Sequence, residues 1–185
     1  MELSILVLPL LASIISGFFG RYIGDRNSEI VTSLLVSIAA VFSFIVFYNV
    51  IVNQYETNIT LATWISSGSL DVNWSMKIDP LSAVMLVVVT SVSALVHIYS
   101  IGYMSHDPHK PRFMAYLSLF TFAMLMLVTS DNFIQLFFGW EGVGLCSYFL
   151  IGFWFKKDTA NAAAIKAFLV NRVGDFGFAL GIFLI

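Results

Sequence analysis

Six long blocks of apolar residues, separated by short polar clusters, constrain this chain more than any other feature. The blocks cover residues 3–20, 30–52, 80–101, 112–129, 133–154 and 161–185. A helix needs about 20 mostly apolar residues to cross the hydrocarbon core of a bilayer. Charged residues make up only 11% of the chain, well below the roughly 25% of a typical soluble domain. We therefore expect an all-α integral membrane protein with about six transmembrane helices, for which the lipid bilayer is the surrounding medium.

The basic residues of the connecting segments predict how the chain is oriented in the membrane. Those that follow the first, third and fifth blocks are Arg21, Arg26, Lys110, Arg112, Lys156 and Lys157. The other side of the membrane receives only Lys77. Because Lys and Arg accumulate in cytoplasmic loops, the distribution predicts a multi-pass protein whose N-terminus lies outside. The absence of basic residues before Arg21 argues against a cleaved signal peptide.

The segment between the second and third blocks is too polar to span a membrane, but it has the pattern of a strand. Polar and apolar residues alternate strictly from Ser69 to Ile78, which is typical of a half-buried strand. Residues 66–68 predict a turn before it, and residues 60–65 can pair back on it. We expect a small external β-hairpin over about residues 60–78.

Composition and histidine spacing exclude several other classes of function. The net charge is −2 and no basic block is present, so we expect no nucleic-acid partner. Cys146 is the single cysteine, which excludes an intrachain disulfide. His97 is the one histidine inside an apolar block, whereas a transmembrane haem usually needs two facing imidazoles. A loop contains His106, Asp107 and His109, but the intervening proline indicates a plain turn, and we predict no metal site.

Ionisable residues within the apolar blocks are the candidate functional residues, since a charge deep in the bilayer costs several kcal/mol. They are Glu141, Lys166, Arg172 and Asp175. Glu141 lies near the middle of its block, flanked by glycines that allow a neighbouring helix to approach closely. The proton affinity of its carboxyl group should depend on burial and on nearby cations, as a proton relay requires.

Arg172 and Asp175 are three residues apart and can pair on one helix face. Counted along its helix, Arg172 is about 16 Å deep, level with Glu141 if the two helices are antiparallel. The alternative is a static ion pair that locks two helices. Lys166 is only about 7 Å from its end of the block, so it can act as a relay or extend its long side chain to the interface.

Several motifs together resemble a known family of membrane proteins. They are Asp79–Ala83, His97–Met104, Ser130–Asn132, Gly139–Tyr148, Ile151–Trp154, Lys166–Phe168 and Asn171–Asp175. In combination they resemble chain 5, also called subunit L, of NADH:quinone oxidoreductase (respiratory complex I), an antiporter-like proton-translocating subunit. The likeness extends over about residues 1–185.

The resemblance implies a fold of two inverted five-helix repeats, preceded by three N-terminal helices. Residues 1–111 would hold these three helices with the hairpin, and residues 112–185 the first three helices of the first repeat. Because the last apolar block reaches Ile185 without a polar flank, we expect an N-terminal fragment. In this family the glutamate matching Glu141 pairs with a lysine on the next helix, which we expect beyond Ile185.

The implied function is proton translocation through intramembrane ionisable residues, driven by quinone reduction in other subunits. The chain would be part of an enzyme, a translocase, without a redox centre of its own. NADH, FMN, iron–sulfur clusters and quinone would be handled by the other membrane and peripheral subunits, which are the expected partners. A bacterial inner membrane is favoured by the missing import signal, although organelle-encoded chains also lack one and a mitochondrial inner membrane stays open.

Two other functions remain in competition with proton translocation by complex I. The large subunit of a multi-subunit Na⁺/H⁺ antiporter shares much of the pattern. A structural assembly subunit with inert charges is the other possibility.

Overall fold

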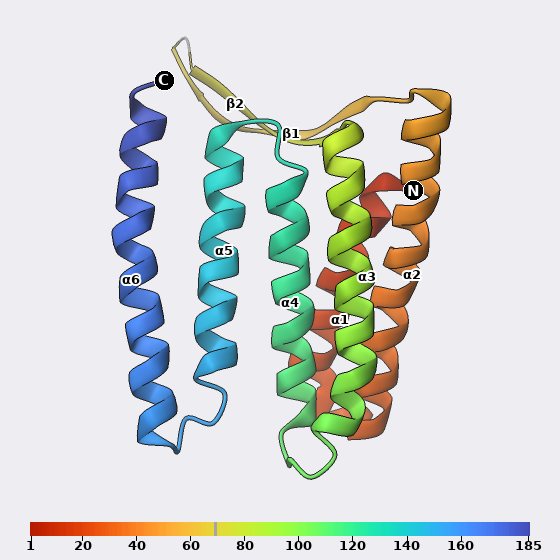
Figure 1. The fold of residues 1–185 in the computed structure, drawn as a ribbon, viewed down its shortest axis with the longest axis vertical. Coiled ribbons are helices and arrows are strands. Elements are labelled where there is room, and N and C mark those ends of the chain that lie inside the picture. The colour runs from red at the N-terminus through yellow and green to blue at the C-terminus, as the bar shows by residue number, and fades with distance from the viewer. Residues whose placement is uncertain (69) are drawn as a thin grey trace.

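The computed structural model describes residues 1–68 and 70–185, and this part of the chain contains six helices and one two-stranded sheet (Figure 1). The helices are α1 (Glu2–Ile23), α2 (Asp25–Asn53), α3 (Pro80–Tyr103), α4 (Lys110–Val128), α5 (Phe133–Ile151) and α6 (Asp158–Phe183). The strands are β1 (Thr57–Ser67) and β2 (Leu70–Ile78). The helices stand side by side, and the hairpin lies across one end of them. The predicted helical membrane fold with an external hairpin is confirmed.

Five of the six helices, α1 to α5, are long and apolar enough to cross a membrane. The sixth, α6, has 26 residues but includes Lys166, Arg172 and Asp175. The predicted ends shift by a few residues: α2 begins at Asp25 rather than near residue 30, and α5 ends at Ile151 rather than at 154. The turn from α1 to α2 is made by Gly24 with φ 89°, a conformation that glycine adopts readily. Because the turn is this short, α2 already includes the polar residues that precede its apolar block.

The connections divide the molecule into two ends (Figure 1). The turns after α1, α3 and α5 lie at one end, which therefore carries the six basic residues Arg21, Arg26, Lys110, Arg112, Lys156 and Lys157. We call this the basic end and the opposite one the hairpin end. The orientation that places the N-terminus outside stays a prediction.

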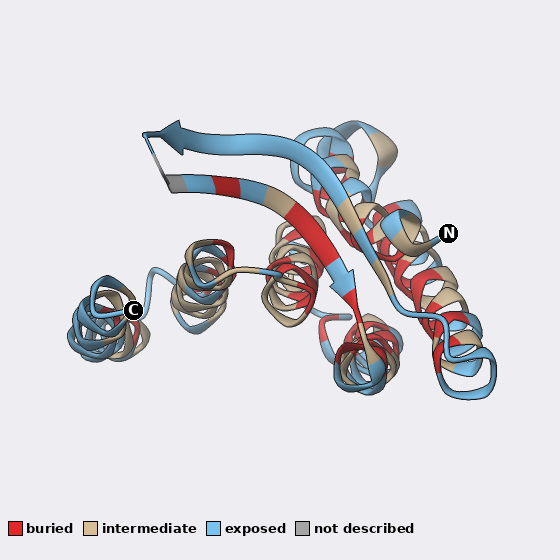
Figure 2. Cartoon of the chain, turned by 90° about the horizontal axis from the view of Figure 1, so that it is seen from above, coloured by how far each residue is buried: buried red, intermediate tan, exposed pale blue. Residues whose placement is uncertain are grey.

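The hairpin is longer than expected, because β1 begins at Thr57 and not at residue 60. Its two strands pair antiparallel. Gly68, which follows β1 in the turn, has φ 61°. Val72, Met76 and Ile78 of β2 are buried, as the alternation predicts, while β1 is mostly exposed (Figure 2). Ser75, on the face predicted to be exposed, is also buried, because Gln135 of α5 packs over its backbone. Ser69, part of the predicted alternation, lies outside the described residues.

One polar contact fixes the hairpin to α5, and a second one caps the helix that follows the hairpin. The carboxamide of Gln135 in α5 accepts from the backbone N–H of Ser75 at 3.0 Å and donates to its carbonyl oxygen at 2.7 Å. At the start of α3, Asp79 accepts from the backbone N–H of Ser82 at 2.7 Å, and this hydrogen bond lowers the pKa of Asp79. The hairpin is therefore hydrogen-bonded to the first turn of α5, and α3 begins at a capped N-terminus directly after β2.

The core lies among α1 to α4, and α5 and α6 extend from it as a row (Figure 2). Its main apolar cluster, at the hairpin end, includes Ile5, Val50, Leu86 and Met126 together with Met76 of the hairpin. Close approach joins α5 to α4, since a Cβ on Gly139 would lie 2.7 Å from the backbone of Leu127. The glycine-flanked segment thus packs closely against a neighbouring helix, as predicted.

Gly139→Ala should destabilise the protein by about 1–3 kcal/mol, the usual cost of an overpacked core. The new methyl group would meet backbone atoms of Leu127, which cannot rotate away as a side chain would. Gly174→Ala is the matched control, because nothing lies within 4 Å of its Cβ position. Thermal unfolding of the purified protein measures both, and equal midpoints for the two variants would contradict the close approach.

Gln135→Leu should release the hairpin from α5. The substitution leaves the N–H and C=O of Ser75 without partners, and each buried unpaired group costs about 1–3 kcal/mol. Limited proteolysis should then cut the hairpin faster. Ser66→Ala serves as control because it removes only an exposed hydrogen bond to Asp71; faster cleavage in that variant as well would show that Gln135 is not the anchor.

Candidate functional site: an intramembrane charge cluster

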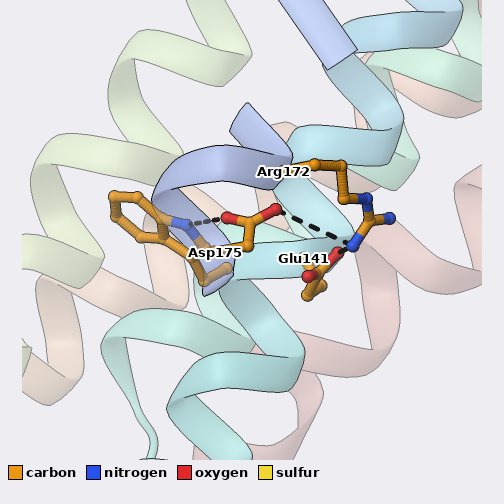
Figure 3. Close-up of polar contacts among 4 residues, drawn as sticks. Glu141, Arg172 and Asp175 are labelled. Carbon is orange, nitrogen blue, oxygen red and sulfur yellow. Dashed lines mark hydrogen bonds and ion pairs between the residues drawn. The ribbon is translucent and has the colours of Figure 1, made fainter. Parts of the chain in front are cut away.

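Three of the four candidate residues meet between α5 and α6 (Figure 3). Arg172 Nη1 donates a hydrogen bond to Glu141 Oε2, and it lies 3.7 Å from Asp175 Oδ2. The predicted pairing of Arg172 with Asp175 on one face of α6 is confirmed, and so is the alignment of Arg172 with Glu141. We call Glu141, Arg172 and Asp175 the charge cluster.

The helix sequences explain why these side chains converge. The i, i+3 spacing of Arg172 and Asp175 stacks them on the face of α6 that contacts α5. On α5, small residues clear the space around Glu141: Gly142 faces Ala123 of α4, and Gly144 faces Asn171 of α6. A longer side chain at Gly144 would push α6 away from α5, so Gly144 helps to set the distance that the ion pair spans, whereas Gly142 permits the approach of α4.

Trp140 is a fourth member of this site that the sequence reasoning missed. Its indole Nε1 donates to Asp175 Oδ1 at 2.9 Å, so Asp175 binds Trp140 with one oxygen and faces Arg172 with the other. The signal in the sequence was the position of Trp140 directly before Glu141, since a tryptophan N–H within an apolar helix needs an acceptor.

Burial differs sharply within the charge cluster. The side chain of Asp175 is 9% exposed, that of Glu141 22% and that of Arg172 44%. The guanidinium also lies 4.6 Å from the ring centre of Phe168, a distance at which a cation is attracted to the ring face. Two carboxylates share one guanidinium, so a single added proton would neutralise the cluster.

A cavity of about 240 Å³ adjoins the charge cluster between α5 and α6. Its lining includes Trp140, Ser147, Asn171 and Asp175. Several polar groups in a space of this size provide what ordered water requires. The site therefore combines ionisable groups with room for water beside them.

Lys166 does not join the charge cluster. It precedes Arg172 by six residues, about 9 Å along the helix axis, and its side chain is exposed. No ion-pair partner of Lys166 occurs among the residues that the structure describes. A relay role for Lys166 stays a prediction.

The histidines lie elsewhere. His97 is fully buried between α3 and α4, where Nδ1 lies 2.7 Å from the carbonyl oxygen of Ser93 and Nε2 3.0 Å from Ser118 Oγ. Asp107 accepts from the backbone N–H of His109 at 2.8 Å, which fits the predicted turn. Over residues 1–68 and 70–185, no group of three or more His, Cys, Asp or Glu side chains is placed to hold a metal ion.

Two protein families match separate parts of the chain. The family described as "NADH-Ubiquinone oxidoreductase (complex I), chain 5 N-terminus" matches residues 64–114. The family described as "NADH:quinone oxidoreductase/Mrp antiporter, TM" matches residues 130–185. The second match contains the whole charge cluster.

Similar proteins come from plants and bacteria. NADH-ubiquinone oxidoreductase chain 5 of Triticum aestivum is 58% identical over 183 residues, covering 99% of this chain and 27% of that protein. NADH-quinone oxidoreductase subunit L of Rhodobacter capsulatus is 58% identical over 186 residues, covering 96% and 26%. The chain thus spans about a quarter of the length of these relatives.

Solved structures show the same fold at lower identity. A membrane-bound sulfane sulfur reductase, an archaeal respiratory membrane complex, contains a chain with TM-score 0.82 and 16% identity, covering 98% of this chain and 36% of that one. The Mrp complex from Dietzia sp. DQ12-45-1b gives TM-score 0.79 and 24% identity, covering 97% and 18%. The chain is a multi-pass membrane protein that belongs to the antiporter-like family containing chain 5, or subunit L, of NADH:quinone oxidoreductase.

Proposed function

We propose that this chain is part of a proton-translocating membrane subunit of NADH:quinone oxidoreductase, and that the charge cluster carries protons. The observation that carries the proposal is the pair of carboxylates, Glu141 and Asp175, sharing Arg172 within apolar helices. Charges in this setting are costly to keep. Identities of 52–59% to proteins named chain 5 or subunit L support the assignment to this complex.

The geometry suggests how protonation and pairing are coupled. Arg172 Nη1 contacts both carboxylates, so a small movement of its side chain redistributes the positive charge between them. When Arg172 moves toward Asp175, Glu141 loses its counter-charge and takes up a proton; the return of Arg172 releases that proton. Trp140 holds Asp175 in place during this exchange.

Protons would reach the charge cluster through water in the adjoining cavity, whose lining includes Ser147 and Asn171. We keep Lys166 as a candidate relay between the cluster and the basic end, because it lies on the same helix nearer that end. The energy would come from quinone reduction in other subunits, which would bind NADH, FMN, iron–sulfur clusters and quinone. The translocase activity belongs to the assembled enzyme.

The expected partners are the other membrane and peripheral subunits of the complex. Relatives occur in bacteria and in plants, so a bacterial inner membrane and a mitochondrial inner membrane both fit, with the N-terminus on the outer side. The alternative of a Na⁺/H⁺ antiporter subunit rests on the match of residues 130–185 that both families share. The match of residues 64–114 to the chain 5 family favours complex I.

Glu141→Gln in the assembled complex should reduce proton pumping at least about tenfold, because a positioned proton-transfer group contributes about 10²–10⁴-fold. Pumping is measured as pH change inside sealed vesicles on addition of NADH. Glu56→Gln is the control, since Glu56 is an exposed carboxylate outside the helices. Unchanged pumping in Glu141→Gln would favour the structural reading of the charge cluster.

Trp140→Phe should lower pumping severalfold, because Asp175 loses a hydrogen bond to a charged group worth about 1.5–3 kcal/mol. The aromatic packing against Phe178 would be kept. Trp154→Phe removes a similar bond, to Asp107 at 2.9 Å in the basic-end loop, and should leave pumping unchanged. Equal effects of the two substitutions would argue that Trp140 does not orient the cluster.

A further inference from the structure

A buried carboxylate outside the charge cluster, Glu29, lies near the start of α2 at the basic end. The residue is only 5% exposed. Its Oε1 atom is buried and has no hydrogen-bond partner in the part of the chain that the structure describes. The nearest cation is Lys110 Nζ, the first residue of α4, at 4.0 Å. This distance is too long for a direct hydrogen bond.

Ser33 lies one helical turn after Glu29 on the same face of α2, and its buried Oγ also lacks a partner. Other hydroxyl groups of this stretch are paired. Thr32 donates to the carbonyl oxygen of Ser28 at 2.8 Å, and Ser28 is bonded to Ser16 of α1. The two unpaired oxygens are therefore a local feature of this face and not a general property of α2.

Burial of Glu29 Oε1 and Ser33 Oγ without a hydrogen-bond partner would lower the stability of the folded protein. A buried polar group without a hydrogen bond costs about 1–3 kcal/mol in proteins, and a charged one costs more. Water between groups separated by more than about 3.5 Å removes that cost. A buried water usually makes about 2–4 hydrogen bonds to groups that otherwise have none. Lys110 can donate to it, Glu29 can accept from it, and Ser33 can do either.

The surroundings connect this position to the basic end. The Lys110 side chain is 20% exposed, so it connects the surface of the basic end with the position of Glu29. Next to Glu29 along α2, Ser28 is hydrogen-bonded to Ser16 of α1, and the Ser16 hydroxyl donates to the carbonyl oxygen of Pro111 at 2.7 Å. The hydroxyls of Ser16 and Ser28 are therefore satisfied within the protein, whereas Glu29 Oε1 and Ser33 Oγ are not.

We propose that Glu29, Ser33 and Lys110 form a binding site for internal water between α2 and α4. The site hydrates the buried carboxylate of Glu29 within the N-terminal helices, and it uses none of the residues of the charge cluster. It stands independently of the proposed proton transport, since it follows from unpaired atoms alone.

Hydroxyl-radical footprinting of the assembled complex tests the site, because radicals generated from bound water oxidise neighbouring side chains. Met114 lies one turn after Lys110 on α4 and is 0% exposed. Met126, on the same helix, is 1% exposed and belongs to the apolar cluster. Met114 should be oxidised severalfold faster than Met126 in the wild-type complex. Equal rates would overturn the proposal.

Variants at Glu29 separate bound water from local opening of the helices. Glu29→Leu should reduce oxidation of Met114 to the level of Met126, whereas Glu29→Gln, which can still bind water, should retain most of it. Glu2→Gln at the hairpin end should change nothing. If Glu29→Leu does not assemble, the comparison of Glu29→Gln with wild type still decides: Met114 oxidation falling to the Met126 level in Glu29→Gln would exclude a water site of this composition.

Discussion

The sharing of Arg172 between Glu141 and Asp175 is the interaction on which the placement of α6 beside α5 depends. Helix α6 packs mainly against α5, and much of its apolar surface is exposed, including Val173 and Phe176. Apolar contacts alone are a weak guide to position for a helix in lipid, because the lipid tails are equally apolar. The charged contacts fix both the height and the rotation of α6 on α5.

At the hairpin end, side chains of α5 and of its N-cap likewise form hydrogen bonds with polar backbone groups that lie outside the helices. Gln135 satisfies both backbone groups of Ser75, and Asn132 donates from its side chain to the carbonyl oxygen of Asn73 at 2.8 Å. Backbone groups buried near a membrane must find partners within the protein. The hairpin is therefore held by hydrogen bonds from α5 as well as by the burial of Met76 and Ile78.

Much of the fold could be predicted because its signals are local. A helix that crosses a bilayer needs a continuous apolar block, and a half-buried strand needs alternation, so both appear in short windows of sequence. Part of the charge cluster was equally accessible, since the i, i+3 spacing pairs Arg172 with Asp175 on one helix. The bond from Trp140 to Asp175 joins residues 35 positions apart, and no local pattern encodes such a contact.

The sequence by itself determined the membrane class, the number and order of the helices, the hairpin and the identity of the charged residues within the apolar blocks. These features follow from the local composition and from the spacing of apolar residues, both of which are set by residues close together in the sequence. Tertiary structure decided which charges are in direct contact: Arg172, which the sequence placed level with Glu141, pairs with it, Lys166 stays apart, and Glu29 faces Lys110. The reason is physical, since contacts between helices depend on how each helix is rotated and on where glycines such as Gly139 permit close approach.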